Sequence, residues 1–155
     1  MSTTTAAQVD VRGPRFVAWI TTAVLVVTLI TSAVSSRAAA VILSVQAVVF
    51  AIGAIAGPKR HPYGLVFVGL VAPRLGPARD REPVPPLKFA QLVGFVFAVA
   101  GVLGFAAGVP ALALTATGFA LVAAFLNAAF GICLGCQLYP LVARVRKNST
   151  GPSPA

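Results

Sequence analysis

The chain has 155 residues, of which 58% are hydrophobic and only 10% are charged. Soluble domains carry about 25% charged residues, so this composition excludes an ordinary water-soluble protein. Lys and Arg outnumber Asp and Glu by 12 to 3, but the basic residues stand at the ends of long apolar runs. That placement is typical of membrane proteins and argues against nucleic acid as a partner.

Four uncharged apolar runs are long enough to cross a lipid bilayer, which needs about 20 residues. They cover about residues 16–34, 38–56, 89–109 and 111–132. Short turns join the first run to the second and the third to the fourth. The sequence therefore predicts an all-α membrane protein, with four transmembrane helices arranged as two helical hairpins. A cleaved signal peptide is the rival interpretation of the first run, but the usual apolar region of such peptides has only about 7–15 residues.

Basic residues mark one side of the membrane. Eleven of the twelve fall in the termini and the middle loop, and only Arg37 falls in a short turn. The positive-inside rule then places both termini in the cytoplasm of a multi-pass protein of the inner (cytoplasmic) cell membrane. We expect residues 14–147 to form the membrane domain, and residues 1–13 and 148–155 to be disordered.

The middle loop, residues 57–88, contains seven prolines and six basic residues. The prolines exclude one continuous helix through this segment. Residues 64–72 are apolar but too few to span a bilayer, so we expect them to lie in the interface or re-enter from the cytoplasmic side. The fourth span is expected to leave the hydrocarbon near Gly131 and to continue along the interface.

Glycines recur on one face of the third span, within an arc of roughly 80° at helical spacing. They are Gly94, Gly101, Gly104 and Gly108. The second span carries another pair, Gly53 and Gly57. Such faces allow neighbouring helices to approach closely. Three amides lie in or near the spans: Gln46, Gln91 and Asn127. We expect them to form hydrogen bonds between helices, with ligand binding as the alternative.

The segment Cys133-Leu134-Gly135-Cys136 holds both cysteines of the chain, at the end of the fourth span. A Cys-X-X-Cys pair beside positive charge tends to have one thiol of lowered pKa, and the thiolate is the reactive form. Three interpretations stay open: a redox-active dithiol, a pair of metal ligands, or two small residues in a packed helix. Since only one histidine could complete a metal site, we expect no metal and no cofactor.

Lys59, Arg60 and His61 follow the second span, on the predicted side of the cysteines. Their charge and imidazole make them candidate binding residues beside the catalytic candidates Cys133 and Cys136. The alternative for the segment that begins at His61 is an ordinary turn, because Pro-Tyr-Gly follows it.

Three segments carry a family resemblance: residues 127–136, which include the cysteines, residues 57–64, and residues 74–77. Through them the chain, over about residues 10–145, resembles the bacterial membrane family catalogued as domain of unknown function 4395. Members are commonly encoded beside thioredoxin-like or rhodanese-like sulfur proteins. The resemblance therefore implies a thiol or sulfur-transfer partner.

The leading hypothesis is a membrane thiol–disulfide redox partner of a cytoplasmic thioredoxin-like or sulfurtransferase protein, acting through a mixed disulfide. In it, Cys133 lies nearer the bilayer and faces a lipid-soluble acceptor such as a quinone. The architecture also resembles the vitamin K epoxide reductase and disulfide-bond-forming quinone reductases, although their second cysteine pair is missing here. The alternative is a non-enzymatic membrane anchor or transport subunit that docks a sulfur-handling protein on residues 57–88. Homo-oligomerisation stays open.

Overall fold

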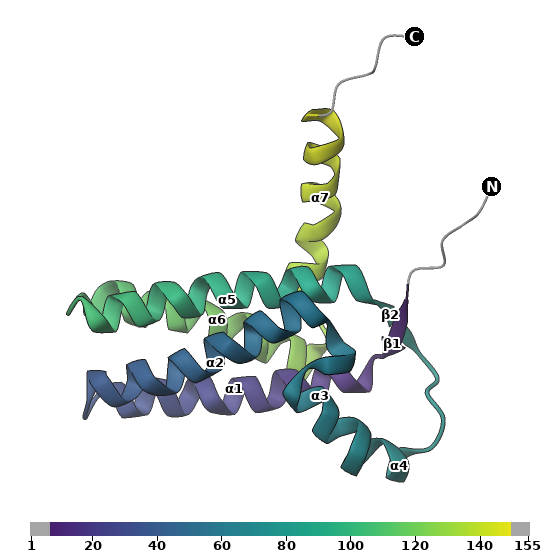
Figure 1. The fold of residues 1–155 in the computed structure, drawn as a ribbon, viewed down its shortest axis with the longest axis horizontal. Coiled ribbons are helices and arrows are strands. Elements are labelled where there is room, and N and C mark those ends of the chain that lie inside the picture. Colours follow the sequence, from purple (N-terminus) through teal and green to yellow (C-terminus); the bar gives the residue numbers. More distant parts are fainter. Residues whose placement is uncertain (1–6, 150–155) are drawn as a thin grey trace.

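A computed structural model describes residues 7–149 and contains a bundle of four long helices (Figure 1). They are α1 (Arg12–Ser32), α2 (Ser36–Ala56), α5 (Val84–Ala106) and α6 (Pro110–Phe130). All four are long and apolar enough to cross a membrane. The predicted all-α membrane architecture of two helical hairpins is therefore confirmed.

The four helices pack in a ring, with α2 against α1 and α5, and α6 against the other sides of α1 and α5. Both hairpins turn at the same end of the bundle (Figure 1). Ser35 begins α2 by accepting a hydrogen bond from the Ala38 N–H at 3.2 Å. Pro110 stands in the first turn of α6, where its missing N–H costs nothing.

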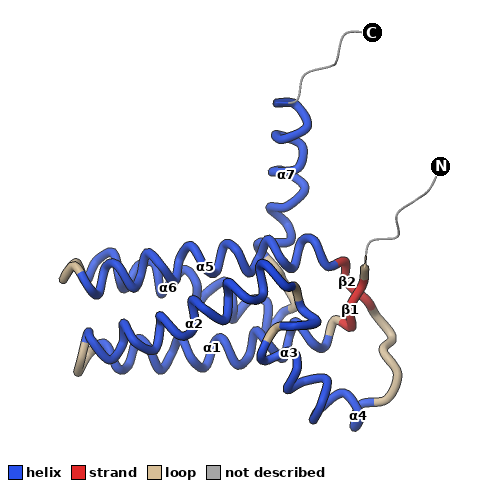
Figure 2. Tube along the Cα trace, viewed as in Figure 1, coloured by secondary structure: helices blue, strands red, loops and turns tan. Residues whose placement is uncertain are grey.

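At the opposite end, β1 (Gln8–Asp10) and β2 (Arg81–Pro83) form a small antiparallel sheet (Figure 2). The structure here corrects the expectation that residues 1–13 are disordered, because residues 8–10 are a strand and α1 begins at Arg12. Residues 1–6 lie outside the described part of the chain. The pairing joins residues far apart in the sequence, which no local pattern could indicate.

Arg12 fixes this sheet to the middle loop. Its guanidinium donates hydrogen bonds to the Asp10 carboxylate, the closest at 2.8 Å. It also donates to the backbone carbonyls of Leu75 and Gly76, at 3.0 Å each. One side chain thus joins the N-terminal strand to the far end of the loop.

The first half of the loop is an irregular helical segment. A 3₁₀ turn, η1 (Pro58–Arg60), precedes α3 (Pro62–Val66), the π-helical η2 (Phe67–Val71) and α4 (Ala72–Leu75). The segment leaves the bundle at an angle beside the start of α1 (Figure 1). Phe67 is buried there, with its ring 5.6 Å from that of Phe16.

The last helix, α7 (Leu134–Ser149), turns away from the bundle. Gly131, with φ +69°, ends α6, and α7 then runs nearly perpendicular to the four long helices (Figure 1). If the bundle axis crosses a bilayer, this direction lies along the membrane surface. Residues 148 and 149 belong to α7, which corrects the expected start of the disordered tail. Residues 150–155 lie outside the described part of the chain.

Close packing of the long helices depends on glycines of α5. A Cβ added to Gly101 would lie 2.6 Å from Leu43 Cδ2 and 2.9 Å from Thr117 Oγ1. At Gly104 it would lie 2.5 Å from the backbone nitrogen of Ala113, so two helix backbones meet there. Gly108 is different, because it occupies the turn after α5 with φ +68°. Three of the four predicted glycines therefore make the packing face.

Polar groups and surface composition both suit a lipid environment. The hydroxyls of Thr22, Thr28 and Thr117 donate to carbonyls one turn earlier, at 2.7–2.8 Å, which satisfies them inside their own helices. The outer surface is apolar: Ile30 is 67% exposed and Ile55 is 78% exposed. In water such an apolar surface would promote aggregation, whereas contact with lipid stabilises it.

We predict that Gly104→Ala destabilises the bundle by about 1–3 kcal/mol, because the new methyl group meets the backbone of α6. The matched control is Gly118→Ala on α6, where a Cβ meets nothing within 4 Å among the described residues. The control should be neutral or stabilising by up to about 1 kcal/mol, since Gly weakens a helix relative to Ala. Thermal unfolding in detergent, followed by circular dichroism, measures both. Equal effects of the two substitutions would contradict the packing described here.

Candidate functional site

A cavity of about 560 Å³ begins at the strand end of the bundle and reaches inward between the long helices. Its inner wall includes the rings of Phe50, Phe97 and Phe119. Toward the strands its lining becomes polar. The polar side chains there are Gln8, Asp10, Lys59, His61, Arg81, Gln91, Asn127 and Cys133. The volume falls in the range of small-molecule sites, about 300–1,000 Å³.

The two cysteines form a disulfide, with their Cα atoms 5.2 Å apart. Cys133 directly precedes α7, and its Sγ accepts a hydrogen bond from the Cys136 N–H at 3.3 Å. Its carbonyl accepts the N–H of Gln137 at 3.1 Å. The Cys133 sulfur therefore occupies the N-cap position of a helix. In the reduced protein this position stabilises a thiolate, because unpaired N–H groups and the helix dipole favour negative charge.

Packing against α5 fixes the position of this disulfide. A Cβ added to Gly135 would lie 2.5 Å from Ala90 Cα, so only a residue without a side chain allows α7 to approach this closely. The Tyr139 ring contacts that of Phe89, with centroids 6.1 Å apart. Both cysteines are half-buried. Among the described residues, Cys133 lines the cavity and Cys136 does not.

His61 is the most buried ionisable side chain of the cavity, at 2% exposure. Gly53 makes room for it, because a Cβ there would lie 2.6 Å from His61 Cδ2 and 2.9 Å from Gln91 Oε1. Among residues 7–149, neither ring nitrogen of His61 has a hydrogen-bond partner of good geometry. Gln91 Oε1 also lacks such a partner among these residues. The side chain of Gln91 has a single acceptor atom, Oε1. Even if a small rotation brought Oε1 within hydrogen-bond distance of one ring nitrogen of His61, the other ring nitrogen would stay unpaired. Buried polar atoms without a protein partner can bind a ligand or a water molecule.

Burial also sets the charge of His61. Desolvation lowers its pKa below the ordinary value of 6.5, and the nearby Gln91 amide opposes this by favouring the protonated ring. Burial is the larger effect, so the ring is neutral at pH 7. A neutral imidazole presents one N–H donor and one acceptor nitrogen to the cavity.

A second polar contact lies next to His61. The Tyr63 hydroxyl donates to Gln46 Oε1 at 2.9 Å, and the Tyr63 ring lies 5.4 Å from that of His61. Gln46 is fully buried. The expected hydrogen bond from a membrane amide to another element is thus confirmed for Gln46, with α3 supplying the partner.

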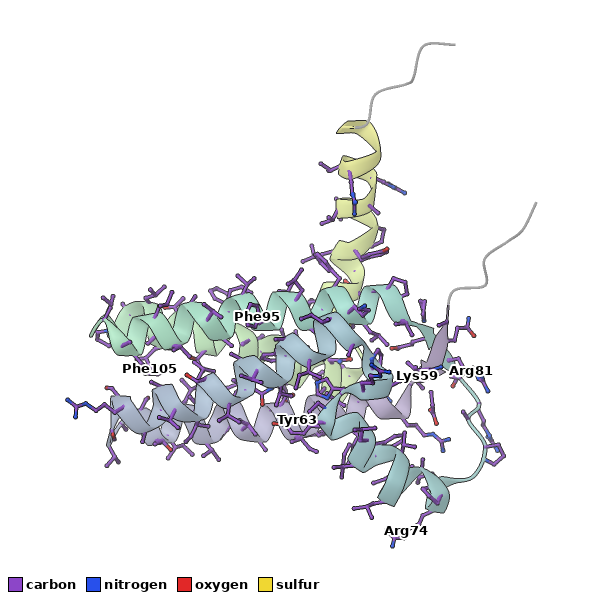
Figure 3. The ribbon with its side chains drawn as sticks, viewed as in Figure 1. Lys59, Tyr63, Arg74, Arg81, Phe95 and Phe105 are labelled. Atoms are coloured by element: carbon purple, nitrogen blue, oxygen red, sulfur yellow. A yellow bond between two sulfur atoms is a disulfide. The ribbon has the colours of Figure 1, made fainter. Side chains whose placement is uncertain are left out.

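The sequence-based candidates separate into three groups. Cys133, His61 and Lys59 line one cavity, whereas Cys136 lies on the first turn of α7 and Arg60 is exposed outside the cavity. Lys59 lies at the strand end of the bundle together with Arg81, and Phe105 lies at the opposite end (Figure 3). Among the described residues, no three His, Cys, Asp or Glu side chains gather as a metal site would require.

Several lining residues were not among the sequence-based candidates. Asp10 and Arg81 reach the cavity because their strands pair, and the Phe rings carry no signal that separates a wall from ordinary packing. Gln91 and Asn127 did give a signal, since amides are rare near membrane spans.

We predict a pH-dependent stability that requires His61. The unfolded chain binds a proton on this residue below about pH 6.5, whereas the folded chain binds it only at lower pH. Stability is therefore complete above pH 6.5 and falls with decreasing pH, by at most about 1.4 kcal/mol per pH unit. Thermal unfolding of the parent protein and of His61→Gln between pH 7.5 and pH 5 measures this. Asp10 and Glu82 titrate equally in both proteins, so parallel curves would refute a buried, neutral His61.

A family model described as Domain of unknown function (DUF4395) matches residues 9–144, which include every long helix and both cysteines. No curated protein and no solved structure matches the chain. The match covers most of the sequence, including the bundle, the loop and the cavity. The chain therefore belongs to the family of the domain of unknown function 4395.

Proposed function

We propose that this protein is a membrane thiol–disulfide exchanger whose Cys133–Cys136 pair reacts with a soluble thioredoxin-like or sulfurtransferase protein. The observation that carries the proposal is the disulfide at the N-terminus of α7, with Cys133 on the wall of a cavity and Cys136 outside it. A pair placed only for packing would not require one sulfur at a helix N-cap. The family resemblance, which implies a thiol or sulfur-transfer partner, supports the same proposal.

The helix N-terminus also favours one order of reaction. A thiolate of the partner attacks Cys136 Sγ, the Cys133–Cys136 bond breaks, and Cys133 leaves as the stabilised thiolate. The partner's second thiolate then attacks the mixed disulfide and releases Cys136. The partner loses two electrons and gains a disulfide, while this protein gains two electrons and becomes a dithiol. The same steps in reverse would oxidise this protein.

The distribution of charge supports a cytoplasmic partner. Exposed basic side chains gather at the strand end of the bundle, where the disulfide also lies: Arg15, Lys59, Arg60, Arg74, Arg79 and Arg81. Arg37 stands at the opposite end, in the turn between α1 and α2. By the positive-inside rule we infer that the strand end faces the cytoplasm across the inner membrane.

The redox potential of the cysteine pair tests this function directly. We expect a reversible disulfide with a potential between roughly −300 and −180 mV, the range of working exchangers. Membranes are equilibrated with glutathione buffers, and free thiols are trapped with a maleimide. Thiols that stay reduced and unreactive throughout would reject the exchanger and make them packing residues.

Single cysteine variants test the order of attack. Cys133→Ser leaves Cys136 alone, outside the cavity, so we expect it to accumulate a stable mixed disulfide with its partner. Cys136→Ser leaves the sulfur that faces the cavity, and we expect little adduct from it. Non-reducing gels and mass spectrometry of the captured adducts provide the measurement. More adduct on Cys136→Ser than on Cys133→Ser would reverse the assignment.

A membrane anchor for a sulfur-handling protein is the second candidate function. The exposed basic side chains of the loop favour it, since they offer a docking surface for an acidic partner. Combined charge reversal at Lys59, Arg60 and Arg74 should then abolish partner capture, whereas replacing both cysteines with serine should leave capture intact. Arg37→Glu at the other end of the bundle is the control. Loss of capture in the double serine variant alone would favour the exchanger.

A further inference from the structure

Once a partner has reduced the cysteine pair to a dithiol, an electron acceptor is needed to oxidise it again. The chain contains only two cysteines, so no second pair can receive electrons within it. Cys133 does not face a bare surface, because it lines the cavity that continues inward to Phe97 and Phe119. Both phenylalanines stand near the middle of helices long enough to cross the membrane. A carrier that fills this cavity and meets Cys133 must therefore have an apolar part that suits the inner wall.

We propose that the cavity binds a quinone, with its oxygen-bearing ring at His61 and Cys133 and its apolar part between Phe50, Phe97 and Phe119. This inference rests on the proposed exchange function and names the second substrate of the same cysteine pair. The proposed site requires a ligand that carries two electrons, dissolves in the bilayer and has polar oxygens at one end only.

The polar end of the cavity matches such a ring. Among the described residues, His61 has buried ring nitrogens without a partner of good geometry, and Gln91 Oε1 is likewise unpaired. An imidazole N–H donates to a quinone carbonyl, and an amide oxygen accepts from a hydroquinone hydroxyl. The two side chains lie together at Gly53, so both can serve one ring. The oxidised and the reduced ligand would each find a partner there.

The inner end of the cavity matches an apolar body. The rings of Phe97 and Phe119 contact each other, with centroids 5.9 Å apart, and both line the cavity. Ala120 and Ala123 of α6 complete this wall with small side chains. The charged lining residues belong to the strand end: Asp10, Lys59 and Arg81. A nucleotide cofactor would place its phosphates among apolar groups if it entered this deeply, at a large desolvation cost.

The redox step balances with the quinone as oxidant. The Cys133 thiolate adds to a ring carbon, forming a C–S bond, and His61 donates a hydrogen bond to the carbonyl oxygen that gains charge. The Cys136 thiolate then attacks Cys133 Sγ, so the S–S bond forms and the C–S electron pair stays on the ring. The ring gains two electrons and takes up two protons, matching the two protons that the thiols lose. It leaves as a hydroquinone.

The test uses the full-length protein, reduced and purified in detergent under anaerobic conditions, with decylubiquinone as the probe. Its ring carbons all carry substituents, which disfavours a stable thiol adduct. Disulfide formation is followed by maleimide trapping, and quinone reduction by ultraviolet absorbance. We expect one hydroquinone for each disulfide formed.

Two substitutions locate the site. Ala123→Phe fills the cavity from α6, and Val122→Phe is its matched control, since Val122 is 54% exposed on the outer face. We expect Ala123→Phe and His61→Gln each to slow quinone reduction at least about tenfold, a difference of about 1.4 kcal/mol in activation free energy. Val122→Phe should react like the parent protein. Unfolding curves identify any variant that fails to fold, and the other variant then decides.

The outcomes separate this inference from the proposed function. If glutathione buffers oxidise and reduce the pair but decylubiquinone does not, the exchanger stands and the quinone site is wrong. If the quinone oxidises the parent, Ala123→Phe and His61→Gln at equal rates, the reaction does not use this cavity and the inference is also overturned. If neither reagent changes the cysteines, both proposals fail.

Discussion

Gly94, Gly101 and Gly104 let α5 lie directly against α2 and α6, and the bundle around the cavity depends on this approach. In lipid the hydrophobic effect does not drive helices together, so close van der Waals contact has to hold them. A Cβ added at these glycines would lie only 2.5–2.8 Å from the nearest atom of α2 or α6, so any larger residue forces the neighbouring helix or side chain to shift. The same device recurs at Gly53 and Gly135, where it positions His61 and α7.

The cavity opens at the strand end of the bundle. There α1 and α2 are held by the loop and the small sheet, and the Arg12 hydrogen bonds to Asp10 and to the Leu75 and Gly76 carbonyls keep that end in place. Polar side chains can line the opening because it lies at the charged end of the spans. Cys133 lines the cavity and Cys136 lies outside it, so in the proposed exchange the two sulfurs of this disulfide meet different reactants.

Much of the candidate site followed from residue type. Cysteines three apart, a single histidine beside basic residues, and three amides near the spans were visible as unusual groups in an apolar chain. Arg60 shows the limit of that reasoning, because it adjoins His61 in sequence yet is exposed and does not line the cavity. Residues 8–13 show another limit, since their order depends on a strand more than seventy positions away. Neighbours in sequence share a region, but only backbone direction decides which side chain faces inward.

The sequence by itself determined the membrane class, the four helices, their pairing as hairpins and the glycine face of α5. These follow from apolar length, loop length and helical periodicity, which are properties of short segments. Only the tertiary structure decided that His61, Gln91 and Cys133 line one cavity, and that α7 packs closely on α5 at Gly135 after the expected exit near Gly131. Those placements depend on contacts between residues distant in the chain, chiefly His61 and Gln91 at Gly53, and Ala90 at Gly135. The energies of these contacts arise from side chains that meet only after the helices have packed.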